Sequence, residues 1–176
     1  MALVPGQLAP EFEAVDWKGS PVRLADHRTR KVWLAFFRYA GCPLCNLRVH
    51  DIIARHEGLT ARGVDVLAVF QSSPERIASY VGKQSPPFPI LADPTESLYG
   101  KYGLRTSLWA YLHPKNLGVA FRAMRRGFIP GPPDGHATRV PGDFLIRPGG
   151  TLADVYHGKV ISDHIPFDRV EAFAST

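Results

Sequence analysis

The sequence predicts an α/β domain in which helices cover both faces of a mixed sheet. Two apolar runs of strand length, 32–37 and 64–70, are typical of strands buried within a sheet. One segment of helical length separates them, and two further strand candidates flank a Pro-Gly turn near the end of the chain. This order indicates a β-α-β unit followed by an antiparallel hairpin.

The helix of the β-α-β unit is predicted from Pro43 to about His56, with Gly58 near its end. Its apolar positions recur at helical spacing and therefore form one face. They are Cys45, Val49, Ile52 and Ile53. Proline favours the first helical position, so Pro43 supports this start.

The elements that follow are shorter. Ser73 before Pro74 is typical of a helix N-cap, which predicts a second helix to about Val81 before the Pro86-Pro87 stop. The others expected, in chain order, are a strand over 89–92, a helix over 96–102, hairpin strands over 144–146 and 152–156, and a helix over 167–173.

Residues 1–176 suffice for one domain, without requiring a second. The connection over 93–140 is too long for a plain crossover and is interpreted as an insertion before the hairpin. Its best helical stretch is 113–126, followed by a turn-rich loop over 127–135. Leu117, Phe121 and Met124 are the apolar side chains of that stretch available for packing. Such an insertion can be a lid, an oligomer contact or a surface covering, and a structural role is favoured.

The composition of the chain limits the kinds of partner that it can bind. The hydrophobic fraction is 45%, the charged fraction is 21%, and no apolar stretch approaches the roughly 20 residues of a membrane span, so no membrane partner is predicted. The first residues lack the features of a secretory signal, which favours a cytoplasmic location.

The net charge is +5. Its densest basic group is Lys115, Arg122, Arg125 and Arg126. Without a nucleic-acid motif this group is interpreted as a solvated helix face; no nucleic acid is predicted, and an anionic partner or substrate stays open.

The two cysteines, Cys42 and Cys45, stand three residues apart directly after the first apolar run. In a reducing compartment such a pair is catalytic or metal-binding more often than structural. A zinc site needs four ligands, and only scattered histidines such as His50 and His56 could complete one. We therefore predict redox chemistry with no metal and no bound cofactor; a packing role and half of a zinc site are the alternatives that stay open.

The two thiols are expected to differ. With Pro43 at the first helical position, Cys42 becomes the N-cap and Cys45 lies one turn inside the helix. The helix terminus favours the thiolate, so Cys42 is predicted to be the more exposed and more activated sulfur and Cys45 the shielded one. Attack by Cys42 on a peroxide gives a sulfenic acid, which Cys45 condenses to a disulfide.

Nearby cations bear on this chemistry. Arg38, at the end of the first strand, could lower a thiol pKa or orient an anionic oxygen. Arg48, on the helix, is expected to face solvent. The polar cluster over 157–164 is interpreted as ordinary loop hydrogen bonding.

With these residues assembled, the chain resembles the thioredoxin-fold redoxins, most closely the peroxiredoxin-like proteins of the alkyl hydroperoxide reductase and thiol-specific antioxidant (AhpC/TSA) group. The resemblance is carried by the segments 6–12, 17–24, 36–45 and 140–146. It implies a thioredoxin-like fold and reduction of a peroxide or disulfide substrate. Recycling would use an external dithiol such as a thioredoxin- or glutaredoxin-like protein, and a homodimer stays open.

The resemblance also implies two further site residues. In that fold the proline before the hairpin strand is usually cis and faces the cysteine pair, so it implies a cis bond between Val140 and Pro141 beside the thiols. Arg139 could stand in for the arginine that helps to polarise the peroxide in typical family members.

The cysteine pair departs from the typical family motif Pro-x-x-x-Thr-x-x-Cys. Counting from the strand puts Cys45 on the peroxidatic cysteine, with Cys42 replacing the threonine and Arg38 the proline. Aligning Cys42 with the peroxidatic cysteine instead puts Tyr39 at the threonine position and Ala35 at the proline position. We favour Cys42 on the helix-terminal argument. The leading function is hydroperoxide reduction through the dithiol; the alternatives are a protein disulfide reductase or exchange protein without strong peroxidase activity, and a non-enzymatic redox-sensing interaction module.

Overall fold

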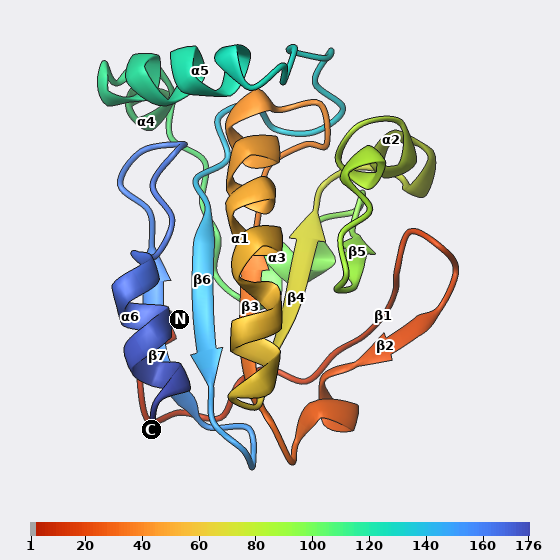
Figure 1. Cartoon of the computed structure of the whole chain (residues 1–176), viewed down its shortest axis with the longest axis vertical. Helices are drawn as coiled ribbons and strands as arrows, with labels where there is room; N and C mark the ends of the chain where they lie inside the picture. The colour runs from red at the N-terminus through yellow and green to blue at the C-terminus, as the bar shows by residue number, and fades with distance from the viewer. Residues whose placement is uncertain (1–2) are drawn as a thin grey trace.

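The computed structural model describes residues 3–176, and its centre is a five-stranded mixed sheet (Figure 1). The strand order is β5-β4-β3-β6-β7. The bounds are β3 Lys31–Phe36, β4 Val64–Phe70, β5 Ile90–Ala92, β6 Gly142–Ile146 and β7 Leu152–His157. The first three run parallel, and β6 and β7 form the antiparallel part. The predicted α/β class and mixed sheet are confirmed.

Helix α1 (Pro43–Ala61) makes the crossover between β3 and β4 and packs against the sheet (Figure 1). It runs one turn beyond the expected end near His56, so Gly58 lies inside it. A glycine in a helix costs about 1 kcal/mol. Burial of Leu59 in the core offsets that cost, and Gly63, with φ +78°, makes the turn into β4.

Side chains of the strands point alternately to the two faces of the sheet and pack in two hydrophobic cores, one on each face. Trp33, Ala35 and Phe37 point to the face covered by α1 and by α6 (Phe167–Ala174). Leu34 and Phe36 point to the opposite face, which α3 (Ser97–Lys101) covers. Both faces of β3 are therefore buried, which explains its uninterrupted apolar sequence.

Several short elements were missed or misjudged from the sequence. The antiparallel pair β1 (Glu13–Val15) and β2 (Pro21–Arg23) and the 3-10 turn Leu24–His27 were not predicted. The second helix ends earlier than expected, as α2 (Pro74–Ser79), and a 3-10 turn follows over Val81–Gln84.

The 93–140 segment contains α3, α4 (Leu108–Leu112) and α5 (Lys115–Arg125). Both α4 and α5 lie across the end of the molecule at which α1 begins (Figure 1). The expected helix over 113–126 is thus shorter, and α4, before Pro114, was missed. Leu117, Phe121 and Met124 do not pack in a core, contrary to expectation: all three are exposed. Among residues 3–176, no helix is long and apolar enough to cross a membrane.

Candidate active site

The cysteine pair lies where the buried strand β3 gives way to α1. Cys42 is the N-cap of α1, with extended φ and ψ of −76° and 117°, and Pro43 takes the first helical position, as predicted. Its Sγ accepts a hydrogen bond from the backbone N–H of Cys45 at 3.4 Å. The sulfur therefore takes the place of the usual capping oxygen, in contact with the positive end of the helix dipole.

Both thiols are free and buried. Cys42 is 0% exposed and Cys45 is 2% exposed, so the expectation that Cys42 is the more exposed sulfur is wrong. The physical reason is packing of the β3–α1 junction against segments that are distant in the sequence. One of them, residues 127–137, which we call the covering loop, contacts Gly41 directly before Cys42 through Gly131.

Hydrogen bonds and an ion pair fix the covering loop to the segments that follow β3 and β4. The backbone N–H of Gly131 donates to the carbonyl of Gly41 at 2.9 Å, and a Cβ on Gly41 would come within 3.0 Å of the Gly131 backbone. Asp134 accepts a hydrogen bond from the Ser72 hydroxyl at 2.8 Å, and Arg76 lies 3.5 Å from the same carboxylate. Because Ser72 also accepts from the backbone N–H of Ala40 at 2.7 Å, it links the loop to the segment that carries the thiols.

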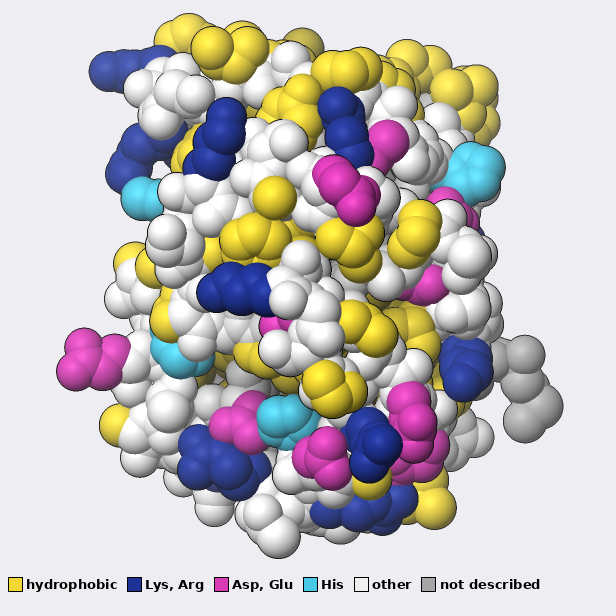
Figure 2. Space-filling model, turned by 90° about the vertical axis from the view of Figure 1, so that its right-hand side faces the viewer, with side chains coloured by type: hydrophobic (Ala, Val, Ile, Leu, Met, Phe, Trp, Pro, Cys, Tyr) yellow, Lys and Arg dark blue, Asp and Glu magenta, His cyan; other side chains and the backbone are white. Residues whose placement is uncertain are grey.

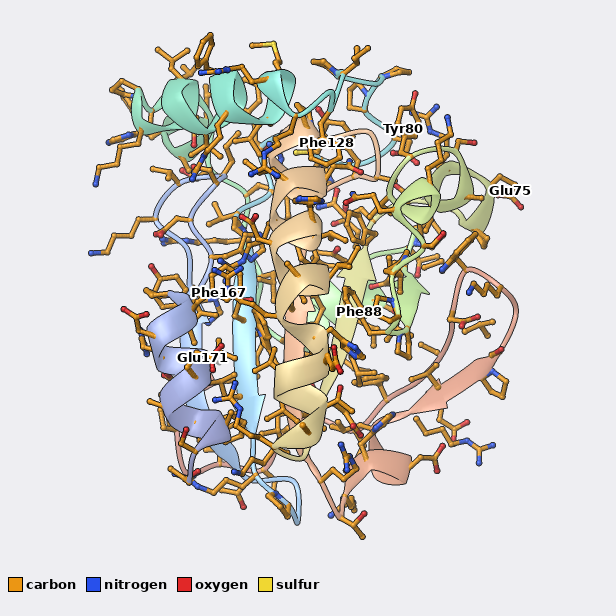
Figure 3. The ribbon with its side chains drawn as sticks, viewed as in Figure 1. Glu75, Tyr80, Phe88, Phe128, Phe167 and Glu171 are labelled. Carbon is orange, nitrogen blue, oxygen red and sulfur yellow. The ribbon has the colours of Figure 1, made fainter. Side chains whose placement is uncertain are left out.

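Asn46 braces the same segment from inside α1. Its side-chain amide donates to the carbonyls of Ala40 and Cys42, at 2.7 and 2.9 Å. Asn46 also lines a hollow of about 360 Å³. The other lining residues are Ser79, Tyr80, Lys83, Gln84, Gly127, Phe128 and Ile129. Figure 3 shows Tyr80 and Phe128 at the end of α1 that begins with the cysteines.

The environment separates the two thiols electrostatically. Burial raises the pKa of Cys42, but the Cys45 thiol, the Arg38 guanidinium and backbone N–H groups outweigh it and bring the pKa down to about 7. Burial and the neighbouring Cys42 sulfur raise the pKa of Cys45 well above its usual range. The pair therefore has one sulfur that ionises near neutrality and one that stays protonated.

Arg38 is the cation of the site. It is buried, and its Nη1 lies 3.5 Å from the Sγ of Cys42. Its guanidinium lies 5.1 Å from the ring centre of Tyr39 and 5.7 Å from that of Tyr111 on α4. The Nε of Arg38 is buried and has no hydrogen-bond partner within residues 3–176. Arg38 thus contacts the more acidic sulfur and keeps one donor free.

Arg48 does not face solvent as expected. Its guanidinium packs over the rings of Phe167 and Trp33, at 3.8 and 5.5 Å, and donates to the carbonyl of Ile165. The aromatic side chain of Phe167 on α6 points towards α1 in Figure 3. This stacking holds Arg48 over the core away from Cys42, so it serves the packing of α6.

The hydrogen bonds and the ion pair of Arg139 are made to residues other than the cysteines. It is buried, donates to the carbonyl of Leu104 at 2.9 Å and forms an ion pair with Glu96. Its guanidinium lies 5.2 Å from the ring centre of Tyr99, whose hydroxyl donates to the carbonyl of Phe37 at 2.8 Å. Through Tyr99, Arg139 is linked to the residue that follows β3 and not to the sulfur atoms.

The expected cis bond before Pro141 is wrong, because no peptide bond among residues 3–176 is cis. Trans is the intrinsically favoured form, by about 0.5–1 kcal/mol before proline. The extended path is fixed on both sides: Val140 donates to the carbonyl of Arg105 at 3.0 Å, and Pro141 accepts from Gly158 at 2.9 Å. Val140, rather than Pro141, belongs to the small core cluster against which Leu44 of the cysteine motif packs.

Sequence reasoning missed the residues that brace and cover the site. They are Tyr39, Asn46, Ser72, Tyr111 and Asp134. The only sequence signal was that Tyr39 and Asn46 flank the cysteine motif; the others come from distant segments. In the part of the chain that the structure describes, no three His, Cys, Asp or Glu side chains gather in a group that could hold a metal ion.

The family model for the AhpC/TSA family matches residues 5–155. The chain belongs to the AhpC/TSA family. Peroxiredoxin Bcp of Escherichia coli is 28% identical over 102 residues, which are 58% of this chain and 65% of that protein. A Mycobacterium tuberculosis protein provisionally described as a peroxiredoxin is 34% identical over 104 residues, 57% of this chain and 66% of the relative. These alignments thus span just under two thirds of the relatives' lengths.

Solved structures of the same fold cover nearly the whole chain. The peroxidoxin BcpB of Mycobacterium tuberculosis superimposes with a TM-score of 0.71 at 17% identity, over 97% of this chain and 96% of the other. A Chlorobium tepidum protein, provisionally described as the thiol:disulfide interchange protein DsbE, gives a TM-score of 0.67 at 18% identity, over 98% and 99%. The predicted thioredoxin-like fold is confirmed.

Proposed function

We propose that this member of the AhpC/TSA family is a thiol peroxidase in which Cys42 attacks the peroxide and Cys45 resolves the product. The observation that carries the proposal is the unequal pair of sulfur atoms. With a pKa of about 7, roughly half of Cys42 is thiolate at pH 7. The protonated Cys45 beside it is the resolving thiol.

The reaction proceeds in two steps. The Cys42 thiolate attacks one peroxide oxygen, the O–O bond breaks, and the departing oxygen takes up a proton to leave as water or an alcohol. Cys42 is then a sulfenic acid. The Cys45 sulfur attacks the Cys42 sulfur, its proton and the sulfenic hydroxyl leave as water, and a Cys42–Cys45 disulfide remains. An external dithiol reduces that disulfide by exchange.

Arg38 supports the first step in two ways. Its charge beside Cys42 favours the thiolate. Its unpartnered Nε offers a donor that can stabilise the negative charge developing on the departing oxygen. Arg139 and Pro141 are placed outside this step in the proposal, since Arg139 is paired with Glu96 and Pro141 lies against Gly158.

The test is stopped-flow oxidation of the reduced protein by hydrogen peroxide and by an organic hydroperoxide, with mass spectrometry of the first product. We expect a disulfide in the wild type, a persistent sulfenic acid at Cys42 in Cys45→Ser, and no reaction at Cys45 in Cys42→Ser. Sulfenic acid forming at Cys45 in the Cys42→Ser variant would reverse the assignment.

A second candidate is thiol-disulfide exchange without strong peroxidase activity. It is favoured by the sequence at the site, because counting from β3 puts Cys42 where typical relatives have the peroxide-orienting threonine. Slow oxidation by peroxides together with fast reduction of a disulfide substrate in the same assay would select this function.

A further inference from the structure

The outer side of α5 exposes its large apolar side chains. Leu117 is 73% exposed, Phe121 60% and Met124 53%. Their spacing of four and three residues places them in one stripe along the helix. The side of α5 that faces the molecule carries Asn116 and Ala123, which are buried, and Val119 and Ala120, which are half-buried. The helix therefore presents its bulky apolar side to solvent.

Helix α4 extends this surface. Trp109 is 86% exposed and Leu112 is 65% exposed. We call the surface made by both helices the α4–α5 face. Its exposed large apolar residues are Leu108, Trp109, Tyr111, Leu112, Leu117, Phe121 and Met124. Figure 2 shows hydrophobic side chains along the upper edge of the molecule, the end where Figure 1 places α4 and α5. Large apolar side chains gathered on one exposed surface mark an interaction site.

The charge of the surrounding chain is one-sided. Residues 97–133 contain six Lys and Arg residues and no Asp or Glu. In the whole chain, by contrast, 21 Lys and Arg residues are largely balanced by 16 Asp and Glu residues, which leaves a net charge of +5. The six are Lys101, Arg105, Lys115, Arg122, Arg125 and Arg126. Three cations of the α4–α5 face, Lys115, Arg122 and Arg125, form no ion pair with any residue in 3–176. Arg125 lies 5.9 Å from the ring centre of Phe121, so charge and apolar stripe adjoin.

These features together select the occupant. A second copy of the chain docked through the same face would bring unpaired cations against cations. Nucleic acid would meet the cations but not protruding leucine and methionine side chains. An anionic bilayer satisfies both: apolar side chains enter the boundary between headgroups and acyl chains, and Lys and Arg contact the headgroups.

We propose that the α4–α5 face binds the surface of lipid bilayers that contain anionic lipids. No spanning segment is required, because an amphipathic helix lies in the plane of the membrane. From the sequence, no membrane partner was predicted because no apolar run is long enough to span a bilayer. The sequence could not show that the apolar stripe of α5 faces solvent. Tyr111 of α4 lies over Arg38, so docking would turn the cysteine end of the molecule towards the bilayer.

The test is sedimentation of the protein with vesicles, either of phosphatidylglycerol mixed with phosphatidylcholine or of phosphatidylcholine alone. We expect binding to the anionic vesicles that weakens as salt is raised. Each cation near the surface contributes about fivefold in partitioning, so Arg122→Gln/Arg125→Gln should bind about 25-fold more weakly. Leu117→Gln/Phe121→Gln should also lose binding, and both pairs are exposed, so the variants should fold.

The matched control removes two exposed cations from the distant β1–β2 pair. Lys18→Gln/Arg23→Gln has the same net charge as the arginine variant and should keep most of the binding. Two results would overturn the proposal: no preference for anionic over neutral vesicles, or a homodimer in sedimentation velocity that Leu117→Gln/Phe121→Gln dissociates. The readout needs no catalysis, so it stands or fails separately from the proposed peroxidase activity.

Discussion

Replacing Arg38 with methionine tests the electrostatic account of the site. The Nη1 of Arg38 lies 3.5 Å from Cys42 Sγ, and both groups are buried. At an effective dielectric constant of about 20, unit charges at that distance interact by roughly 5 kcal/mol. The free energy of solvation that the buried guanidinium loses offsets part of this interaction energy. We therefore expect the pKa of Cys42 to rise from about 7 by at least about one unit.

The assay is the pH profile of Cys42 alkylation by iodoacetamide, followed by mass spectrometry. A rise of one unit lowers the thiolate fraction at pH 7 from about one half to about one tenth, a loss of roughly fivefold in rate that higher pH restores. Arg38→Lys retains the charge and should shift the midpoint less. Arg48→Met removes a half-buried arginine that packs on Phe167 and Trp33, and it should leave the midpoint unchanged. A folded Arg38→Met protein with the wild-type midpoint would refute the reasoning.

Three further outcomes are expected. Peroxide oxidation of Cys42 should accelerate as pH rises through about 7 and level off above it, because the depressed pKa makes the thiolate the major form there; a rate that falls over this range in stopped flow would contradict the assignment. Asp134→Asn weakens the contacts of the covering loop by about 1 kcal/mol, so alkylation of Cys42 should be about fivefold faster, with Asp154→Asn unchanged. The buried Asp143 carboxylate accepts hydrogen bonds from the Trp33 indole N–H and the backbone N–H of Ile165. Asp143→Ala removes it and should cost about 3–5 kcal/mol in urea unfolding, against at most about 1 kcal/mol for Asp154→Ala, whose carboxylate pairs with Arg169 at the surface; equal losses would contradict the burial argument.

The junction of β3 and α1 could be predicted from the sequence because every determinant is local. An apolar run, a proline at the first helical position and recurrent apolar residues fix the strand, the N-cap and the helix face. The inequality of the two thiols also follows from this local order. The strands β1 and β2 were missed because three residues each are too few to show a period.

The surroundings of the thiols could not be predicted in the same way. The segment that carries the buried Cys42 is contacted by Gly131, and through Ser72 by Asp134, about 90 residues away in a loop whose composition indicates only turns. Arg139 looked available in the sequence, but folding brings it to Glu96, which is 43 residues distant. Val140 and Pro141 bond to Arg105 and Gly158, neither of which is a sequence neighbour. Long-range pairing decides each of these features.

The closure of the covering loop over Gly41 has a kinetic consequence. Because neither sulfur is exposed in the structure, we expect an oxidant to reach Cys42 only after a local opening, which the Gly131 and Asp134 contacts of the covering loop oppose. At low oxidant the observed rate is then proportional to its concentration, and at high oxidant it reaches a plateau set by the opening step alone. The height of that plateau belongs to the protein and is the same for every oxidant that enters by this route.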